Sequence, residues 1–189
     1  ISIWDTPEAK GEKIALLFPG HGSQYARQAR EMTATIPELR AAMDHIDELM
    51  LEPLGYRLSS WLYPPSTFQE DEEEQQNKPL SNPHKSVLAL AAFEAGMIDL
   101  LTDMELKPDM TAGHSLGESA AISYAGAIKR DDWYLYLERR MRLMQDYADT
   151  HIGDLLAINL PREEAMKFCE DYETVALANQ NAPDQTVLG

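Results

Sequence analysis

The chain has 189 residues, of which 44% are hydrophobic, and its formal net charge at pH 7 is -16. This length allows one sizeable hydrophobic core, or one core and part of a second, so we expect one or two domains. The acidic balance argues against a nucleic-acid partner, because phosphate binding depends on clustered lysine and arginine side chains. The single cysteine rules out a disulfide framework.

The chain has no feature that predicts a membrane protein. No uninterrupted apolar run approaches the roughly 20 residues that span a bilayer, and no basic and then apolar leader opens the chain. We therefore expect a cytoplasmic protein with no membrane partner. Residue 1 is Ile, and residues 1–13 are typical of a linker that enters a domain, which indicates a piece of a longer polypeptide.

The first predicted elements are a strand, a helix and a loop. The apolar run from Ile14 to Phe18, ended by Pro19 and Gly20, is typical of a buried parallel strand. Pro37 is well placed to open a helix. Five consecutive acids, Glu70 to Glu74, lie among prolines and polar residues without periodicity, which predicts an exposed loop.

The middle of the chain predicts a buried helix followed by a strand and a second helix. Residues Lys85 to Leu101 are apolar on nearly all sides, so we expect that helix to be buried on several sides. Met110 to Ala112 are typical of a short strand, and Leu116 to Ala127 are rich in small helix formers. The turn between them holds the pattern G-x-S-x-G at residues 113–117.

This pattern has two interpretations. In a nucleophile elbow, a buried strand ends in a sharp turn with the serine at its apex, and a helix leaves at once, so the hydroxyl is exposed at the helix N-terminus. Gly113 and Gly117 suit an elbow, because side chains would obstruct the crossing of strand and helix. Alternatively, Ser115 carries an ordinary hydroxyl in a glycine-rich turn, and the spacing alone leaves this open.

The last third of the chain predicts one long helix and then a separate unit. The helix covers Asp131 to Thr150, and its inward candidates are Leu135, Leu137, Met141 and Met144. From Gly153 the pattern is strand, helix, strand and strand, a compact α+β unit separate from the first sheet. We interpret Cys169, in the helix of that unit, as an inward-facing residue and not as a catalytic thiol.

Four motifs occur in a fixed order along the chain: FPGHGSQ at residues 18–24, GHSLGE at 113–118, RMRLMQ at 140–145 and NAPDQTVLG at 181–189. Together they resemble the malonyl-CoA:acyl carrier protein transacylase family, which includes the acyltransferase domains of fatty-acid, polyketide and polyunsaturated fatty-acid synthases. Four motifs in the right order and spacing are far more specific than any one of them.

The resemblance implies an α/β fold with two subdomains. We expect residues 14–152 to form the N-terminal part of an α/β-hydrolase-like large subdomain with a parallel sheet, and residues 153–189 to form a partial ferredoxin-like small subdomain. In the family the general base is a histidine in a later segment, so we expect no general-base histidine in this chain. The remaining C-terminal segment of the domain is then a required partner, and it should place a histidine within about 3 Å of the Ser115 hydroxyl.

The resemblance also implies a reaction and its residues. In the family the elbow serine takes an acyl group from a coenzyme A thioester and passes it to the phosphopantetheine thiol of an acyl carrier protein. Ser115 matches that serine, and the two oxyanion-binding backbone N–H groups match His21 and Leu116. Arg140 matches the arginine that binds the malonyl carboxylate through two parallel hydrogen bonds, with Arg139 and Arg142 as competing candidates.

The same resemblance implies no metal, no permanently bound cofactor, and neighbouring synthase domains as further partners. The chain departs from the family pattern at two places: His21 stands where glutamine is usual, and Ser86 with Val87 replaces a Gln-Pro pair. We interpret His114, next to the apex of the turn, as a packing or hydrogen-bonding residue. Two other functions stay open: a serine esterase or thioesterase of the α/β-hydrolase type, and a docking module without catalysis.

Overall fold

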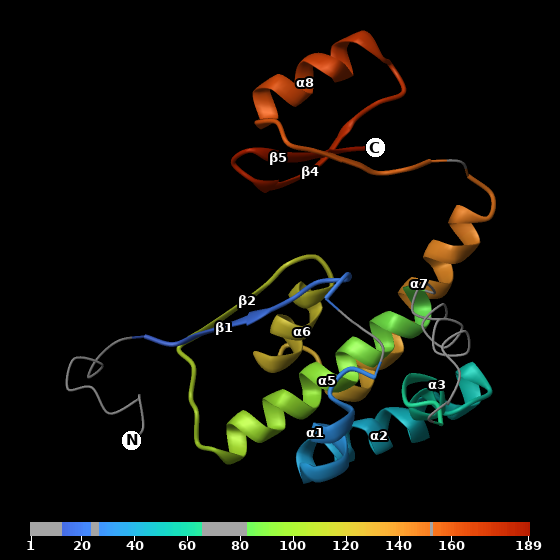
Figure 1. The fold of residues 1–189 in the computed structure, drawn as a ribbon, viewed down its shortest axis with the longest axis vertical. Coiled ribbons are helices and arrows are strands. Elements are labelled where there is room, and N and C mark those ends of the chain that lie inside the picture. Colours follow the sequence, from blue (N-terminus) through green and yellow to red (C-terminus); the bar gives the residue numbers. More distant parts are fainter. Residues whose placement is uncertain (1–12, 24–26, 66–82, 152) are drawn as a thin grey trace. The chain divides into compact units, whose positions relative to one another are not determined.

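The structure of the chain, a computed structural model, describes residues 13–23, 27–65, 83–151 and 153–189. Most of the predicted linker at 1–13 and the acidic run Glu70 to Glu74 lie outside the described residues. The chain divides into two compact units, Ile1–Arg142 and Leu143–Gly189. Figure 1 shows both in the colours of the sequence.

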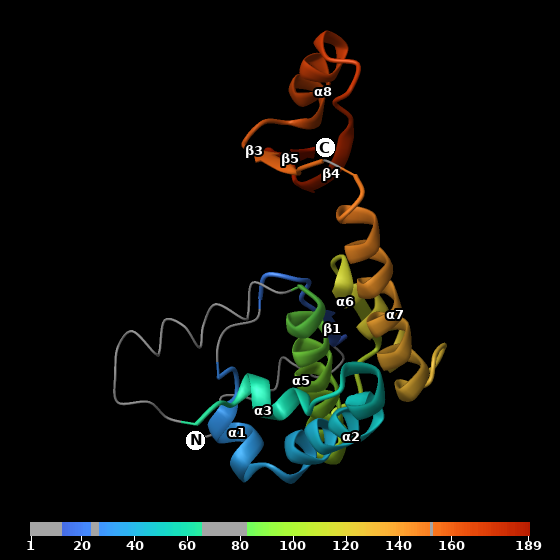
Figure 2. The same ribbon diagram turned by 90° about the vertical axis from the view of Figure 1, so that its right-hand side faces the viewer.

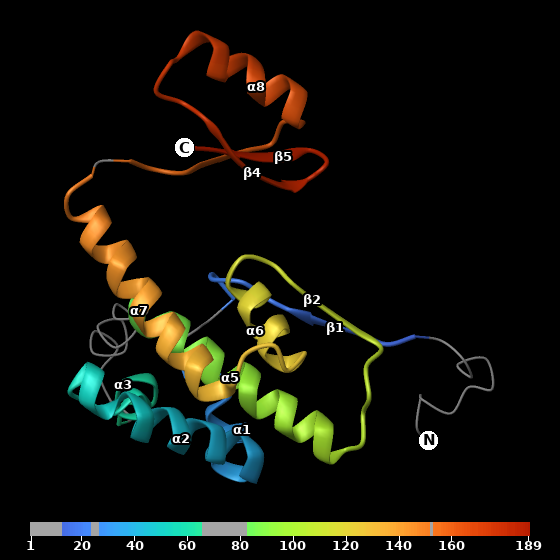
Figure 3. The same cartoon turned by 180° about the vertical axis from the view of Figure 1, so that it is seen from behind.

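The first unit combines a parallel strand pair with helices. Strands β1 (Ala15–Phe18) and β2 (Met110–Gly113) pair in parallel, with Ala15 opposite Met110 and Phe18 opposite Gly113. The helices are α1 (Arg30–Thr35), α2 (Pro37–Leu54), α3 (Leu58–Leu62), α5 (Pro83–Asp103), α6 (Leu116–Tyr124) and the first part of α7 (Arg130–Ala148). Helix α6 lies against both strands, as Figures 1 and 3 show. The α/β class with a parallel sheet, expected from the sequence, is therefore present.

Strand β1 is parallel as predicted, but the prediction that it is buried is only partly right. Phe18 is 8% exposed and Leu16 packs against the core, whereas Leu17 is 76% exposed. Successive side chains of a strand point to opposite faces of a sheet. One face of the β1–β2 pair therefore joins the core with α6, and the face of Leu17 is open among the described residues.

Helix α5 forms the centre of the core, as its apolar sequence predicts. All residues from Ser86 to Ala92 are buried, and α2 packs closely along the helix, as Figure 2 shows. Despite this apolar character, none of the helices among the described residues has the length and hydropathy needed to cross a bilayer.

Helix α7 contacts the core through a face that the sequence predicts only in part. Leu137 and Met141 are buried as expected, but Leu135 is 42% exposed and Met144 is 51% exposed, so these two predictions are wrong. The largest inward side chain is Trp133, which is 1% exposed. The helical period continues from Trp133 to residues 137 and 141, and this phase turns Leu135 outward. Met144 shares the face of Trp133, but it lies beyond Arg142, where the first compact unit ends.

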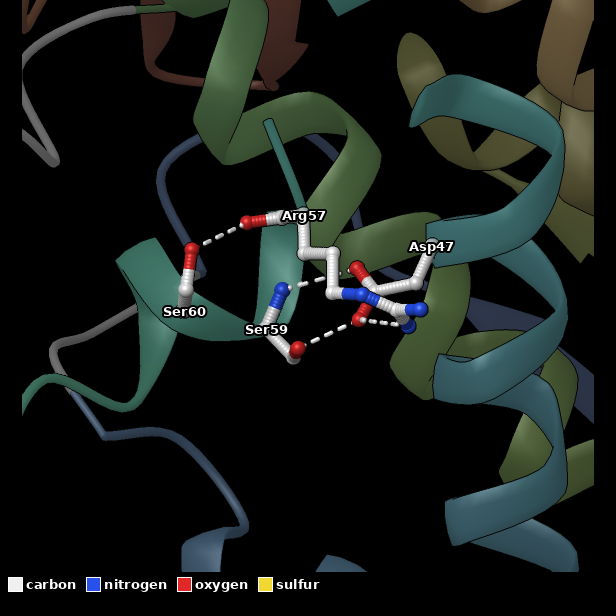
Figure 4. Close-up of polar contacts among 4 residues, drawn as sticks. All are labelled: Asp47, Arg57, Ser59 and Ser60. Atoms are coloured by element: carbon white, nitrogen blue, oxygen red, sulfur yellow. Dashed lines mark hydrogen bonds and ion pairs between the residues drawn. The ribbon is translucent and has the colours of Figure 1, made fainter. Parts of the chain in front are cut away.

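A buried carboxylate ties α3 to α2 (Figure 4). Asp47 of α2 is 1% exposed, and its carboxylate accepts hydrogen bonds from the Ser59 backbone N–H at 2.9 Å and from the Ser59 hydroxyl. The Arg57 guanidinium lies 4.0 Å from the same carboxylate. The backbone carbonyl of Arg57 accepts a hydrogen bond of 2.7 Å from the Ser60 hydroxyl. The first N–H groups of a helix have no acceptor within the helix. Asp47 therefore caps α3 from a neighbouring helix, and these bonds offset the burial of its charge.

Glu94 in α5 is also a buried acid, but unlike Asp47 it lacks hydrogen bonds among the described residues. Its side chain is 4% exposed, and neither carboxylate oxygen has a hydrogen-bond partner among the residues that the structure describes. Burial raises its pKa from 4.5 to about 8. At neutral pH the folded protein therefore holds a proton on Glu94 that the unfolded chain releases.

We expect this proton to make stability depend on pH. Between pH 4.5 and about 8 the free energy of unfolding should fall as pH rises, because the folded state alone keeps Glu94 protonated over that range. In Glu94→Gln this fall should be smaller by up to about 1.4 kcal/mol per pH unit. Urea unfolding of both proteins at a series of pH values measures the difference. The control Glu52→Gln, at an exposed position of α2, should keep the natural slope, and parallel curves for Glu94→Gln would contradict the expectation.

The second unit has the predicted order of strand, helix, strand and strand. These are β3 (Leu156–Ile158), α8 (Arg162–Asp171), β4 (Leu177–Ala182) and β5 (Gln185–Leu188). The sheet order is β3-β5-β4, and β5 is antiparallel to both neighbours. The fully buried Thr186 of β5 donates its hydroxyl to the Leu160 carbonyl at 2.9 Å. Cys169 is half-buried on α8.

Candidate active site

Ser115 lies on a sharp turn between β2 and α6. The strand ends at Gly113, the helix begins at Leu116, and Ser115 has φ 54 and ψ -109. A positive φ at a serine is uncommon, since the Cβ atom crowds the backbone there, and such conformations cluster at functional sites. The serine is exposed. The predicted sequence of strand, turn and helix is thus present, with the hydroxyl at its apex.

The two glycines beside Ser115 permit this turn because the backbone passes too closely for side chains. A Cβ atom on Gly113 would lie 2.0 Å from the Gly117 carbonyl oxygen. A Cβ atom on Gly117 would lie 2.2 Å from the Phe18 carbonyl oxygen. Both distances are below any real contact, so larger residues would displace the strands from the helix.

The loop after β1 packs against the same turn. The His114 backbone N–H donates to the Phe18 carbonyl at 3.2 Å, and a Cβ atom on Gly20 would lie 2.6 Å from the His114 carbonyl oxygen. His21 follows Gly20 directly, so the structure brings the loop of His21 beside the turn of Ser115 and Leu116. Leu116 is the first residue of α6, where backbone N–H groups have no acceptor within the helix and the helix dipole favours negative charge.

The two departures from the family pattern meet in the structure. His21 Nε2 and the hydroxyl of Ser86 are joined by a hydrogen bond of 3.1 Å, and Ser86 is fully buried near the start of α5. The two residues are 65 positions apart in the chain, and sequence reasoning alone does not connect them. Both residues differ from the family motifs, and this shared difference is the sequence signal that could have predicted their contact.

Helix α7 carries the three candidate arginines, and the helical period places them on different faces of the helix. The Trp133 indole N–H donates to the Ser119 hydroxyl of α6 at 2.9 Å, which fixes the face of α7 that meets α6. Arg140 is two helical turns after Trp133, close to that face, and half-buried. Arg139 is exposed, and Arg142 bonds to Glu138 through its guanidinium.

Arg140 is therefore the arginine best suited to bind an anion. In the part of the chain that the structure describes, no carboxylate pairs with Arg140, whereas Glu138 already occupies Arg142. A half-buried guanidinium offers a planar pair of donors that matches the two oxygens of a carboxylate.

The histidine side chains that the structure describes contact groups other than the Ser115 hydroxyl. The His114 ring packs beside Gly20, with Cδ2 at 3.4 Å from the position of a Cβ atom there, and His45 pairs with Asp131 at 2.7 Å. His151 stacks on Tyr147. No side chain among the described residues forms a hydrogen bond with the Ser115 hydroxyl; the side chain of His84 lies outside them. In the same part of the chain no group of three or more acidic, histidine or cysteine side chains is placed to hold a metal ion.

The chain thus has an α/β fold in which an exposed serine lies on a strained strand-to-helix turn, beside a glycine-containing loop that follows a parallel strand. The chain belongs to the acyl transferase domain family, which matches residues 15–189. It is 34% identical over 182 residues to a component of the polyunsaturated fatty acid synthase of Thraustochytrium sp., and the match covers 93% of this chain and 6% of that protein.

Two further comparisons agree with this family. The malonyl CoA-acyl carrier protein transacylase of Bacillus subtilis is 33% identical over 181 residues, or 93% of this chain and 53% of that enzyme. The solved acyl transferase domain of ZmaA superposes with a TM-score of 0.79 and 30% identity over 95% of this chain and 41% of that structure. The chain thus spans about half the length of the transacylase and a small part of the synthase component.

Proposed function

We propose that this chain carries the nucleophile of an acyltransferase that moves a malonyl group from coenzyme A to an acyl carrier protein. Ser115 attacks the thioester carbonyl, coenzyme A thiolate leaves, and the malonyl group rests on Ser115 as an ester. The phosphopantetheine thiol of the carrier then attacks this ester and restores the serine. The names of the relatives support the malonyl group and the carrier partner.

The geometry of the Ser115 turn is the observation that carries the proposal. The serine is exposed at φ 54, where the N-terminus of α6 and the loop of His21 converge. The developing oxyanion can then accept from the N–H groups of Leu116 and His21, and preorganised donors of this kind lower the barrier most when they need no rearrangement. An ordinary glycine-rich turn has no need of a strained serine at its apex.

The proposed role of Arg140 is to bind the free carboxylate of the malonyl group. Its half-buried position and lack of a carboxylate partner among the described residues support this role over Arg139 and Arg142. Binding of the substrate carboxylate by Arg140 also distinguishes the proposed acyltransferase from an esterase or thioesterase. In those enzymes water replaces the carrier thiol, and the substrate needs no free carboxylate. A docking module without catalysis would need neither group.

The subdomain assignment is part of the proposal. Residues 14–152 form part of an α/β-hydrolase-like large subdomain and residues 153–189 part of a ferredoxin-like small one. The sheet order β3-β5-β4 supports the second assignment, because it is a split β-α-β arrangement. The general-base histidine, the remaining segment of the domain, neighbouring synthase domains and the cytoplasmic location remain predictions. No metal or permanent cofactor takes part in the proposed reaction.

A labelling experiment on the full-length protein tests the proposed function. The protein is incubated with radioactive malonyl-CoA, quenched and digested, and the labelled peptide is identified. We expect the label on Ser115, and we expect addition of a phosphopantetheinylated carrier protein to discharge it faster than water does. Discharge by water at the same rate would favour an esterase, and the absence of any label would contradict catalysis at Ser115.

A further inference from the structure

The peptide between Gly20 and His21 is held on its carbonyl side. The Gly20 carbonyl accepts the hydroxyl of Ser23 at 2.9 Å and the Ser23 backbone N–H at 3.4 Å. No described peptide bond is cis, and in a planar trans peptide the C=O and N–H groups point in opposite directions. The hydrogen bonds from Ser23 to Gly20 therefore also fix the direction of the His21 N–H.

The same peptide is anchored by a side chain. The His21 ring bonds to the buried hydroxyl of Ser86 at 3.1 Å, and Ser86 belongs to α5, at the centre of the core. The flanking residues are both glycines, and Gly22 has φ 108. Because glycine restricts the backbone least, a side-chain bond such as that between His21 and Ser86 is needed to tie this glycine-rich segment to the core.

We propose that Ser23 and Ser86 are positioning residues that hold the Gly20–His21 peptide as a preformed oxyanion donor for Ser115. The inference rests on the proposed acyl transfer and deepens it. An oxyanion donor is effective when its direction is set before the reaction starts, since ordering it during the reaction raises the barrier. Neither serine touches the substrate; both act through the backbone N–H of His21.

The test measures acyl-enzyme formation from malonyl-CoA in the full-length protein by rapid quench. Removal of an oxyanion donor reduces kcat by about 100- to 1,000-fold, so partial loss of its orientation in Ser23→Ala or Ser86→Ala should reduce kcat by about tenfold. KM should change by less than about twofold, because the oxyanion exists only in the transition state. In a double-mutant cycle, Ser86→Ala should slow the His21→Ala variant less than it slows the wild-type protein, since each change removes the bond that joins His21 to Ser86.

Two controls separate positioning from stability. Ser59→Ala removes a serine hydroxyl that bonds Asp47 in α2, so it should lower the unfolding midpoint and leave kcat unchanged. His21→Gln keeps a polar side chain that can reach Ser86 and should retain most of the rate that His21→Ala loses. Ser23 is exposed, so Ser23→Ala provides the test even if Ser86→Ala unfolds.

Natural kcat in both serine variants, or a loss confined to KM, would overturn the proposal. If the wild-type protein forms the acyl-enzyme and the serine variants form it at the same rate, this inference alone is overturned. A natural protein that forms no acyl-enzyme would overturn the proposed function together with it.

Discussion

Ser115→Ala should abolish acyl-enzyme formation in the full-length protein while the fold is retained. The methyl group of alanine fits the place of the serine side chain, but it has no oxygen to form the ester. Loss of a serine nucleophile removes the covalent path, and we expect kcat to fall by at least about 10⁴-fold. Mass spectrometry of the quenched protein, together with a transfer assay, measures both losses.

Substitutions in the same region provide the controls for Ser115→Ala. Ser123→Ala, in the same helix α6, should be labelled at the natural rate. Ser115→Gly should be inactive but should raise the free energy of unfolding by roughly 1 kcal/mol, because glycine relieves the strain of φ 54. Malonyl transfer by Ser115→Ala at the wild-type rate would contradict the assignment of Ser115 as the nucleophile.

Arg140→Ala should weaken malonyl transfer far more than acetyl transfer. Breaking a bidentate ion pair in a partly desolvated site should cost about 2 to 4 kcal/mol, equivalent to roughly 30- to 1,000-fold in kcat/KM for malonyl-CoA. Acetyl-CoA has no free carboxylate, so its kcat/KM should change little or increase. Arg140→Lys should recover only part of the loss, because an ammonium group cannot form the two parallel hydrogen bonds.

The neighbouring arginines distinguish this role from general charge effects. Arg139→Ala changes an exposed residue and should leave the ratio of malonyl to acetyl transfer unchanged. Arg142→Ala removes the guanidinium that pairs with the buried Glu138, so it should reduce stability and spare the ratio. Equal slowing of malonyl and acetyl transfer in Arg140→Ala would show that the arginine does not bind the carboxylate.

Part of the fold follows directly from local sequence patterns. The apolar run before Pro19, the nearly all-apolar segment from Lys85 and the G-x-S-x-G turn each predict an element that is present. The α+β pattern after Gly153 is also present in the predicted order. Such patterns are reliable because the periodicity of side chains and the special conformations of glycine and proline act within a few residues.

Local patterns were enough to specify the order of the elements and the serine between two glycines, and the resemblance of the four motifs implied the α/β class. They did not specify which side chains are buried, as Leu17, Leu135 and Met144 show. Packing of the elements also brought the hydroxyl of Ser86 to His21 and the indole of Trp133 to Ser119. Conformational preferences act between near neighbours in the chain, whereas burial and pairing depend on which elements pack together and on the phase at which they meet.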